Sequence, residues 1–202
     1  LYSSAASDVY KRQLVDTPGH VDFSSEMERT LQVLDYAVLV VSGTDGVQGH
    51  TRTLWRLLEQ YRIPAFLFIN KMDLPGADRG AVLEQLRTQL GEGCVDFGQP
   101  EAALWEQVAL CGEEALERYL EQGKLSHRDA AELIRRRRLF PCLFGSALRL
   151  EGVDALLEVL ERDTLAPVYG PDFGARVYKI ARDSQGGRLT WLKVTGGELK
   201  VK

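Results

Sequence analysis

Five consecutive residues near the start of the chain, Asp16-Thr17-Pro18-Gly19-His20, have the types and order needed to hold a phosphate group. Proteins hold phosphate with backbone N–H groups at loop-to-helix junctions and with Mg²⁺ ions bound by carboxylates. We therefore expect Asp16 to bind Mg²⁺, directly or through water. Gly19 lets its N–H group approach the phosphate because it has no side chain to collide. Thr17 and Pro18 complete the turn, which Pro18 stiffens.

His20 follows this turn and is the candidate catalytic residue. In GTP-hydrolysing signalling proteins a glutamine near such a turn orients the attacking water. His20 could orient that water or act through the charge of an imidazolium. A histidine in a surface loop often has no role, but its place directly after Asp16–Gly19 favours the catalytic interpretation.

A second cluster, Asn70-Lys71-Met72-Asp73, has the residues needed to read a guanine base. The Asp73 carboxylate can accept two hydrogen bonds, from the guanine N1–H and from its exocyclic amine. Adenine offers no such pair of donors, so we expect GTP and GDP as ligands and disfavour an ATP-using enzyme. The stem of Lys71 can lie over the flat base, and Asn70 can connect neighbouring loops.

A third short segment, Gly145-Ser146-Ala147, follows an apolar run and is predicted to offer backbone N–H groups to the guanine O6. Alone, these three residues are typical of an ordinary turn. Their order in the chain, after the two preceding clusters, favours a place in the same nucleotide site.

The elements that must position these clusters alternate between strands and helices. Leu14-Val15 is predicted to end a buried strand, and 37–41, 65–69 and 139–144 are short apolar runs typical of strands covered on both faces. Segments 24–34, 51–61, 80–90 and 153–160 have apolar residues at helical spacing. This alternation predicts an α/β fold with a mostly parallel sheet and helices on both faces, the architecture of a P-loop-type G domain.

After residues 1–13, the predicted domain organisation has three parts. Residues 14–162 form a partial GTP-binding domain with a helical insert at about 91–138, in which 113–121 and 126–138 are helices and Ser126 with Asp129 makes a capping box. Residues 163–173 are a linker. Residues 174–202 begin a β-barrel domain, because 176–181 and 188–195 surround a hairpin turn.

The composition is that of an ordinary globular protein, with 45% hydrophobic and 27% charged residues and a net charge of −4. This balance does not call for nucleic acid, although a local basic face can act within an acidic chain. The apolar runs are too short to span a bilayer and no signal peptide is visible. The three cysteines lack metal-site spacing, so we expect free thiols in the reducing cytoplasm.

Residues 1–13 have no apolar periodicity, and residues 3–13 match the translation of a transposon adapter used to prepare sequencing libraries. We expect them to be a sequencing artefact and assign no functional residue there. The alternative is a natural disordered N-terminus.

Together the clusters resemble the translational GTPases of the elongation factor G type. Within that group the chain is most similar to the tetracycline-resistance ribosomal protection proteins. The resemblance implies a GTPase that binds the ribosome, with its ribosomal RNA, at the factor-binding centre and that is otherwise a monomer without membrane contact. The resemblance is carried by the strands after the linker and by the segments Asp16–Phe23, Val33–Asp35, Gly46–Gln48, Thr51-Arg52, Asn70–Asp73, Ala115–Tyr119, Leu139–Pro141 and Gly145–Ala147.

The sequence departs from this group at several points. His50 stands where the group tends to have Gln, and Leu74 where elongation factor G usually has Arg.

Arg135–Arg138 could contact ribosomal RNA, although four arginines that end a helix more often form a solvated face. No GxxxxGK[ST] phosphate-binding motif is present.

We therefore expect an N-terminally truncated fragment that lacks a central strand, aggregates and hydrolyses no GTP by itself. Two alternatives remain open: an elongation factor G-like translocation factor, and a non-catalytic ribosome-binding module.

Overall fold

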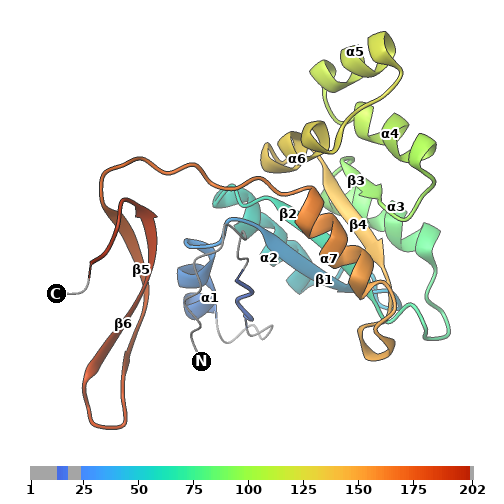
Figure 1. Ribbon diagram of the computed structural model, residues 1–202. Coiled ribbons are helices and arrows are strands. Elements are labelled where there is room, and N and C mark those ends of the chain that lie inside the picture. The colour runs from blue at the N-terminus through green and yellow to red at the C-terminus, as the bar shows by residue number, and fades with distance from the viewer. Residues whose placement is uncertain (1–12, 18–23, 201–202) are drawn as a thin grey trace.

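The structure, a computed structural model, describes the backbone of residues 13–17 and 24–200, and the side chains of these residues except 24–27. Figure 1 shows a helix-covered sheet, a group of helices beyond one end of it, and a separate hairpin. The elements are α1 (Ser24–Leu31), β1 (Ala37–Ser42), α2 (Gly49–Gln60), β2 (Ala65–Asn70), α3 (Arg79–Leu90), β3 (Cys94–Asp96), α4 (Glu101–Ala109), α5 (Glu113–Gln122), α6 (His127–Arg135), β4 (Phe140–Phe144), the 3₁₀ turn η2 (Ala147–Arg149), α7 (Val153–Arg162), β5 (Gly174–Arg182) and β6 (Arg188–Gly196).

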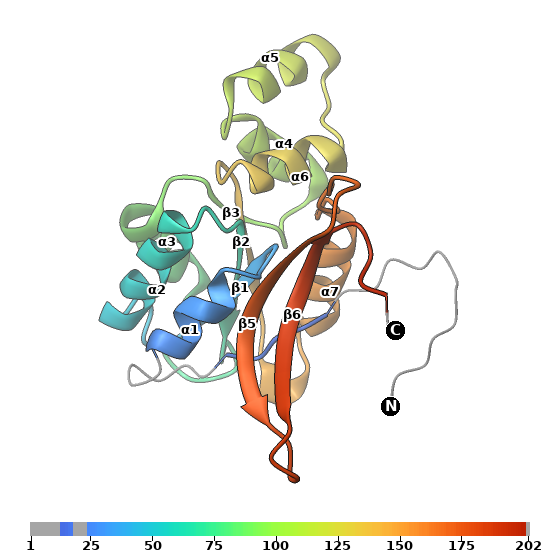
Figure 2. The same ribbon diagram turned by 90° about the vertical axis from the view of Figure 1, so that its left-hand side faces the viewer.

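The main sheet has the order β1-β2-β4-β3, and every pairing in it is parallel. Alternate residues of the central strand β2 point to opposite faces, as the strand geometry requires. Leu67 and Ile69 enter one apolar core, with α1, α2 and α3, whereas Phe66 and Phe68 enter the other, with α4, α6 and α7. Figure 2 shows α2 and α3 on one side of the sheet and α7 on the other. The predicted α/β fold with helices on both faces is confirmed.

The strand predicted to end at Val15 is wrong. Residues 13–17 form no strand, and both Leu14 and Val15 are exposed. A strand is held by pairing with a neighbour, and in the described ranges β1 pairs with β2 alone. The prediction that 37–41 is covered on both faces is also only partly right, because Val40 is exposed while Leu39 and Val41 are buried.

The helical insert contains more structure than the sequence analysis predicted. Strand β3 and helix α4 occupy residues for which no strand or helix was predicted, and α4 buries Leu104, Trp105 and Val108. The predicted helices 113–121 and 126–138 are confirmed as α5 and the shorter α6. The Ser126–Asp129 capping box is also present.

The arginines after α6 do not form a uniformly solvated face. The Arg137 guanidinium lies 5.0 Å from the ring centre of Trp55 and 5.2 Å from that of Phe140. It also donates a hydrogen bond to the Ile63 carbonyl. Burial lowers the pKa of Arg137, whereas Arg135 is exposed. The chain therefore uses Arg137 for packing.

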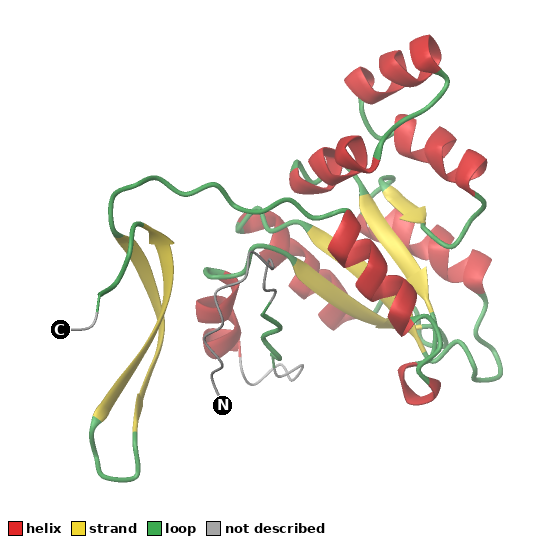
Figure 3. Ribbon diagram, viewed as in Figure 1, coloured by secondary structure: helices red, strands yellow, loops and turns green. Residues whose placement is uncertain are grey.

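The predicted hairpin is confirmed as β5 and β6, an antiparallel pair drawn in yellow apart from the main sheet in Figure 3. Its side chains are largely exposed, including Trp191 at 43%. It contacts the main body at the C-terminal end of α1, where Arg176 donates to the Gln32 carbonyl (2.9 Å) and Lys193 to the Val33 carbonyl (2.8 Å). Whether this hairpin begins a barrel stays a prediction.

The predicted free thiols are confirmed for all three cysteines. Burial raises the pKa of Cys111 to about 11, so that thiol is protonated and unreactive at neutral pH. No helix in the described ranges has the length and apolar character needed to cross a bilayer.

Candidate functional site

Two loops that are far apart in the sequence meet at the carboxyl ends of two neighbouring parallel strands. Asn70 ends β2, and Gly145 directly follows β4. The Gly145 N–H donates to the Ile69 carbonyl (2.9 Å), and the Gly145 carbonyl accepts from the Met72 N–H (3.0 Å). Ligands of open α/β sheets bind in the crevice at this edge. The predicted guanine cluster and the Gly145–Ala147 segment therefore lie side by side at this edge of the sheet.

The side chain of Asn70 fixes the two loops to each other. Its Oδ1 atom accepts hydrogen bonds from the backbone N–H groups of Lys71 and Ala147, both at 2.8 Å. Lys71 has a φ of 64°, a left-handed conformation that turns the chain sharply after β2. The predicted role of Asn70 as a connection between loops is confirmed.

The second loop, residues 145–152, is closed by its own backbone. Ser146 and Glu151 exchange two N–H···O=C hydrogen bonds, each of 3.0 Å. Gly145 is required by this closure, since a Cβ atom there would lie 2.1 Å from the Glu151 carbonyl oxygen. The 3₁₀ turn η2 lies within this loop and ends at Arg149.

This closure engages the backbone donors of the loop. The N–H groups of Gly145, Ser146 and Ala147 donate to Ile69, Glu151 and Asn70 respectively. Their predicted contact with the guanine O6 stays a prediction. The backbone uses these groups to hold the loop beside Asp73.

Asp73 lies where it can present a charged acceptor. Its side chain is only 8% exposed, and its Oδ2 atom lies 3.2 Å from Nε of Arg149. A hydrogen bond from Ser146 lowers the pKa of Asp73, burial opposes that shift, and the Arg149 charge adds to the lowering. The carboxylate is therefore ionised at neutral pH. Arg149 was not predicted from the sequence, because only the fold of the 145–152 loop brings it to Asp73.

The phosphate side of the predicted site is described only in part. Asp16 is exposed and Thr17 half-buried, whereas Pro18, Gly19 and His20 lie outside the described residues. In the described ranges no group of three or more histidine, cysteine or acidic side chains could hold a metal. A single carboxylate such as Asp16 still fits Mg²⁺, which keeps several waters and binds through one or two carboxylates together with phosphate oxygens.

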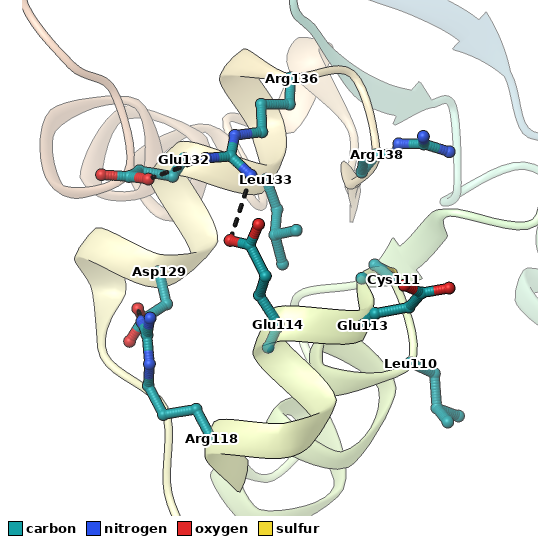
Figure 4. A pocket seen from close by; sticks show the side chains of 12 residues that line it. Leu110, Cys111, Glu113, Glu114, Arg118, Asp129, Glu132, Leu133, Arg136 and Arg138 are labelled. Atoms are coloured by element: carbon teal, nitrogen blue, oxygen red, sulfur yellow. Dashed lines mark hydrogen bonds and ion pairs between the residues drawn. The ribbon is translucent and has the colours of Figure 1, made fainter.

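A cavity of about 610 Å³ lies elsewhere, between α5, α6 and the turn after α4. Two charged pairs cross this cavity (Figure 4): Arg136 with Glu114 at 3.3 Å, and Arg118 with Asp129. The cavity contains none of the predicted site residues. The candidate site is therefore the loop pair at the strand ends.

Comparison with known proteins gives one family and a consistent group of relatives. Residues 2–165 match the family described as "Elongation factor Tu GTP binding domain". Elongation factor G of Ureaplasma urealyticum serovar 10 and of two Ureaplasma parvum serovar 3 strains is 31% identical over 255 aligned residues, which cover 92% of this chain. The crystal structure of ttk003000868 from Thermus thermophilus is similar with a TM-score of 0.77 and 27% identity, over 92% of this chain.

The chain spans little more than a third of these relatives: 37% of each Ureaplasma protein and 35% of the Thermus chain. The likeness therefore concerns only about a third of each relative's length.

Proposed function

The chain belongs to the elongation factor Tu GTP binding domain family, and from that premise we propose that Asp73 and the loops around it bind the base of GTP or GDP. The supporting observation is the connection of the two loops by Asn70. It places the ionised Asp73 at the carboxyl ends of β2 and β4. Asp73 would accept hydrogen bonds from guanine N1–H and the exocyclic amine. The exposed Lys71 stem would lie against the base.

On the phosphate side, Asp16 would hold Mg²⁺ directly or through water, within the turn completed by Thr17, Pro18 and Gly19. His20 would orient the water. Mg²⁺ bound there supplies positive charge that offsets the negative charge of the transferred phosphoryl group. This half of the proposal rests on the sequence pattern and on the fit of a single carboxylate to this ion.

For the whole protein we propose a cytoplasmic GTPase that acts on the ribosome. The finer proposal is ribosomal protection, in which tetracycline is dislodged, and it rests on the sequence resemblance alone. The three relatives named elongation factor G favour translocation as the second candidate.

These two roles are separated by a longer chain that carries a P-loop upstream of Leu14. Such a chain should show GTP hydrolysis stimulated by ribosomes. Growth of cells under tetracycline would support protection, and unchanged drug sensitivity would support translocation.

The base-reading role of Asp73 is tested by Asp73→Asn. An asparagine amide can donate to the O2 carbonyl of xanthine, where guanine has an amine, while Asn Oδ1 still accepts from N1–H. We expect the variant to lose GDP affinity and gain affinity for xanthosine diphosphate. The preference should reverse by at least about tenfold, because a hydrogen bond to a charged group is stronger than one between neutral groups.

Binding is measured by NMR titration of the 202-residue chain with GDP, xanthosine diphosphate and ADP. Asp172→Asn, which removes an exposed carboxylate in the linker, is the matched control and should behave as the parent chain. If Asp73→Asn leaves the preference for GDP unchanged, Asp73 does not read the base.

A further inference from the structure

The carboxylate assigned to guanine is paired with a side chain of the protein. Nε of Arg149 lies 3.2 Å from Oδ2 of Asp73, and the two side chains differ in exposure: 60% for Arg149 and 8% for Asp73. Asp73 is therefore held within the loop pair, while Arg149 approaches it from the solvent side.

The chemistry of the two possible partners of Asp73 is alike. The guanine edge that a carboxylate reads has two N–H donors on one N–C–N unit, formed by N1, C2 and the exocyclic amine. The guanidinium of arginine has the same planar N–C–N unit with parallel N–H donors. A carboxylate that suits one therefore suits the other.

Asp73 does not have room for both partners at once. Its side chain is nearly buried, and Ser146 already hydrogen bonds to it. Arg149, which is 60% exposed, lies against Oδ2 of this carboxylate. A base that approached Asp73 from the side of Arg149 would have to displace the guanidinium.

The backbone sets Arg149 in this position without fixing its side chain. Arg149 ends η2, and its N–H donates to the Ser146 carbonyl (3.1 Å) inside the closed loop. The next residue, Leu150, has a φ of 60°, which reverses the chain toward Glu151. The guanidinium can therefore swing into solvent while every hydrogen bond of the loop remains.

From these observations we propose that Arg149 is an internal competitor of guanine, which occupies the Asp73 carboxylate when no nucleotide is bound and leaves when the base is read. The inference rests on the proposed guanine site and adds a residue that sets its affinity. Because ion pairs with an exposed partner contribute little, the competition tunes affinity by a small factor and does not block the site.

The test compares GDP binding by the 202-residue chain and by its Arg149→Gln variant in NMR titrations at low salt. We expect Arg149→Gln to bind GDP about two- to fivefold more tightly, as the usual strength of such ion pairs allows. Arg149→Lys keeps the positive charge but loses the planar guanidinium with its parallel N–H donors. Its GDP affinity should lie between those of the parent chain and Arg149→Gln. The difference should shrink at high salt, which screens the pair.

Arg56→Gln removes another exposed arginine, on α2, and controls for the change in net charge. Unchanged or weaker GDP binding by Arg149→Gln, with normal binding by the parent chain, overturns the competition but leaves the guanine site intact. If no chain responds to GDP and Asp73→Asn does not respond to xanthosine diphosphate, the proposed function itself fails, and the competition fails with it.

Discussion

At the scale of single residues, the charge of the base site depends on Ser146 more than on Arg149. The hydrogen bond from Ser146 is the largest cause of the lowered pKa of Asp73, and the Arg149 charge contributes less. Ser146 is 1% exposed, so water cannot easily replace its hydroxyl. The acidity of Asp73 is therefore set from inside the loop.

Ser146→Ala should raise the pKa of Asp73 toward its ordinary value, and by more than Arg149→Gln does. A carboxyl with a lowered pKa in the folded state stabilises the fold above its unfolded pKa. That stabilisation is lost as pH falls through the folded pKa. Because the folded pKa of Asp73 is higher in Ser146→Ala, this variant should lose the stabilisation at a higher pH than the parent chain. The measurement is an NMR titration of the Asp73 carboxyl carbon, and a larger shift in Arg149→Gln than in Ser146→Ala would contradict this ranking.

For the proposed guanine site, the sequence indicated which segments come together better than it indicated their contacts. Asn70 and Asp73 could be chosen because their chemistry is local and depends only on following a buried strand. The engagement of the Gly145–Ala147 amides could not be predicted, because it depends on hydrogen bonds with Ile69, Glu151 and Asn70. Arg149 reaches Asp73 only through the same loop closure.

At the scale of elements, the 145–152 loop is limited by how closely its two ends approach. A Cβ atom at position 145 would lie 2.1 Å from the Glu151 carbonyl oxygen and 3.1 Å from the Phe68 ring. Neither neighbour can move freely, since Glu151 is in the loop closure and Phe68 is in the core. The loop therefore depends on glycine at this position.

Gly145→Ala should destabilise the fold by about 2 kcal/mol, within the usual range for overpacking, and should also weaken GDP binding. Chemical denaturation followed by circular dichroism measures the first effect. Gly170→Ala is the control, because a Cβ there meets no atom within 4 Å. Equal stability of the two variants would show that the loop relaxes around an added methyl group.

Elements with long, uniform apolar runs were predicted correctly, and short ones were not. Strands β2 and β4 are buried along nearly their whole length, so composition alone identified them. Strand β3 has only three residues, too few to show an alternating apolar pattern. Helix α4 begins directly after Pro100 and a glycine-bearing segment, whose residues are typical of loops. The strand predicted at Leu14–Val15 failed because pairing is a tertiary property that an apolar dipeptide cannot guarantee.

At the scale of the whole molecule, the hairpin is connected to the main body through the end of α1. The α1 C-terminus carries the negative end of the helix dipole. Arg176 and Lys193 donate to the carbonyls of Gln32 and Val33, and Lys193 also lies 2.6 Å from Asp35. Since α1 begins shortly after the Asp16–His20 segment, the hairpin is attached to the helix closest in sequence to the predicted phosphate turn.

Replacing Arg176 and Lys193 together by Gln should loosen the hairpin from the main body. Each cation near a helix C-terminus contributes about 0.3–1 kcal/mol, so the combined loss is about 1–2 kcal/mol. Hydrogen exchange of the 174–196 amides should become faster, and high salt should have a similar effect on the parent chain. The control is Lys179→Gln, which removes an exposed lysine from β5, the strand of Arg176. If the 174–196 amides of the double variant exchange as slowly as those of the control, the proposed attachment is excluded.

The three tryptophans lie in regions of the molecule that differ in exposure to solvent. Trp55 and Trp105 are 6% and 7% exposed in the two cores, whereas Trp191 on the hairpin is 43% exposed. A collisional quencher such as iodide therefore reaches the fluorescence of Trp191 and leaves that of the other two largely intact. The natural sequence thus contains its own reporter: the quenchable part of the emission measures whether the hairpin face is covered, with no label or substitution needed.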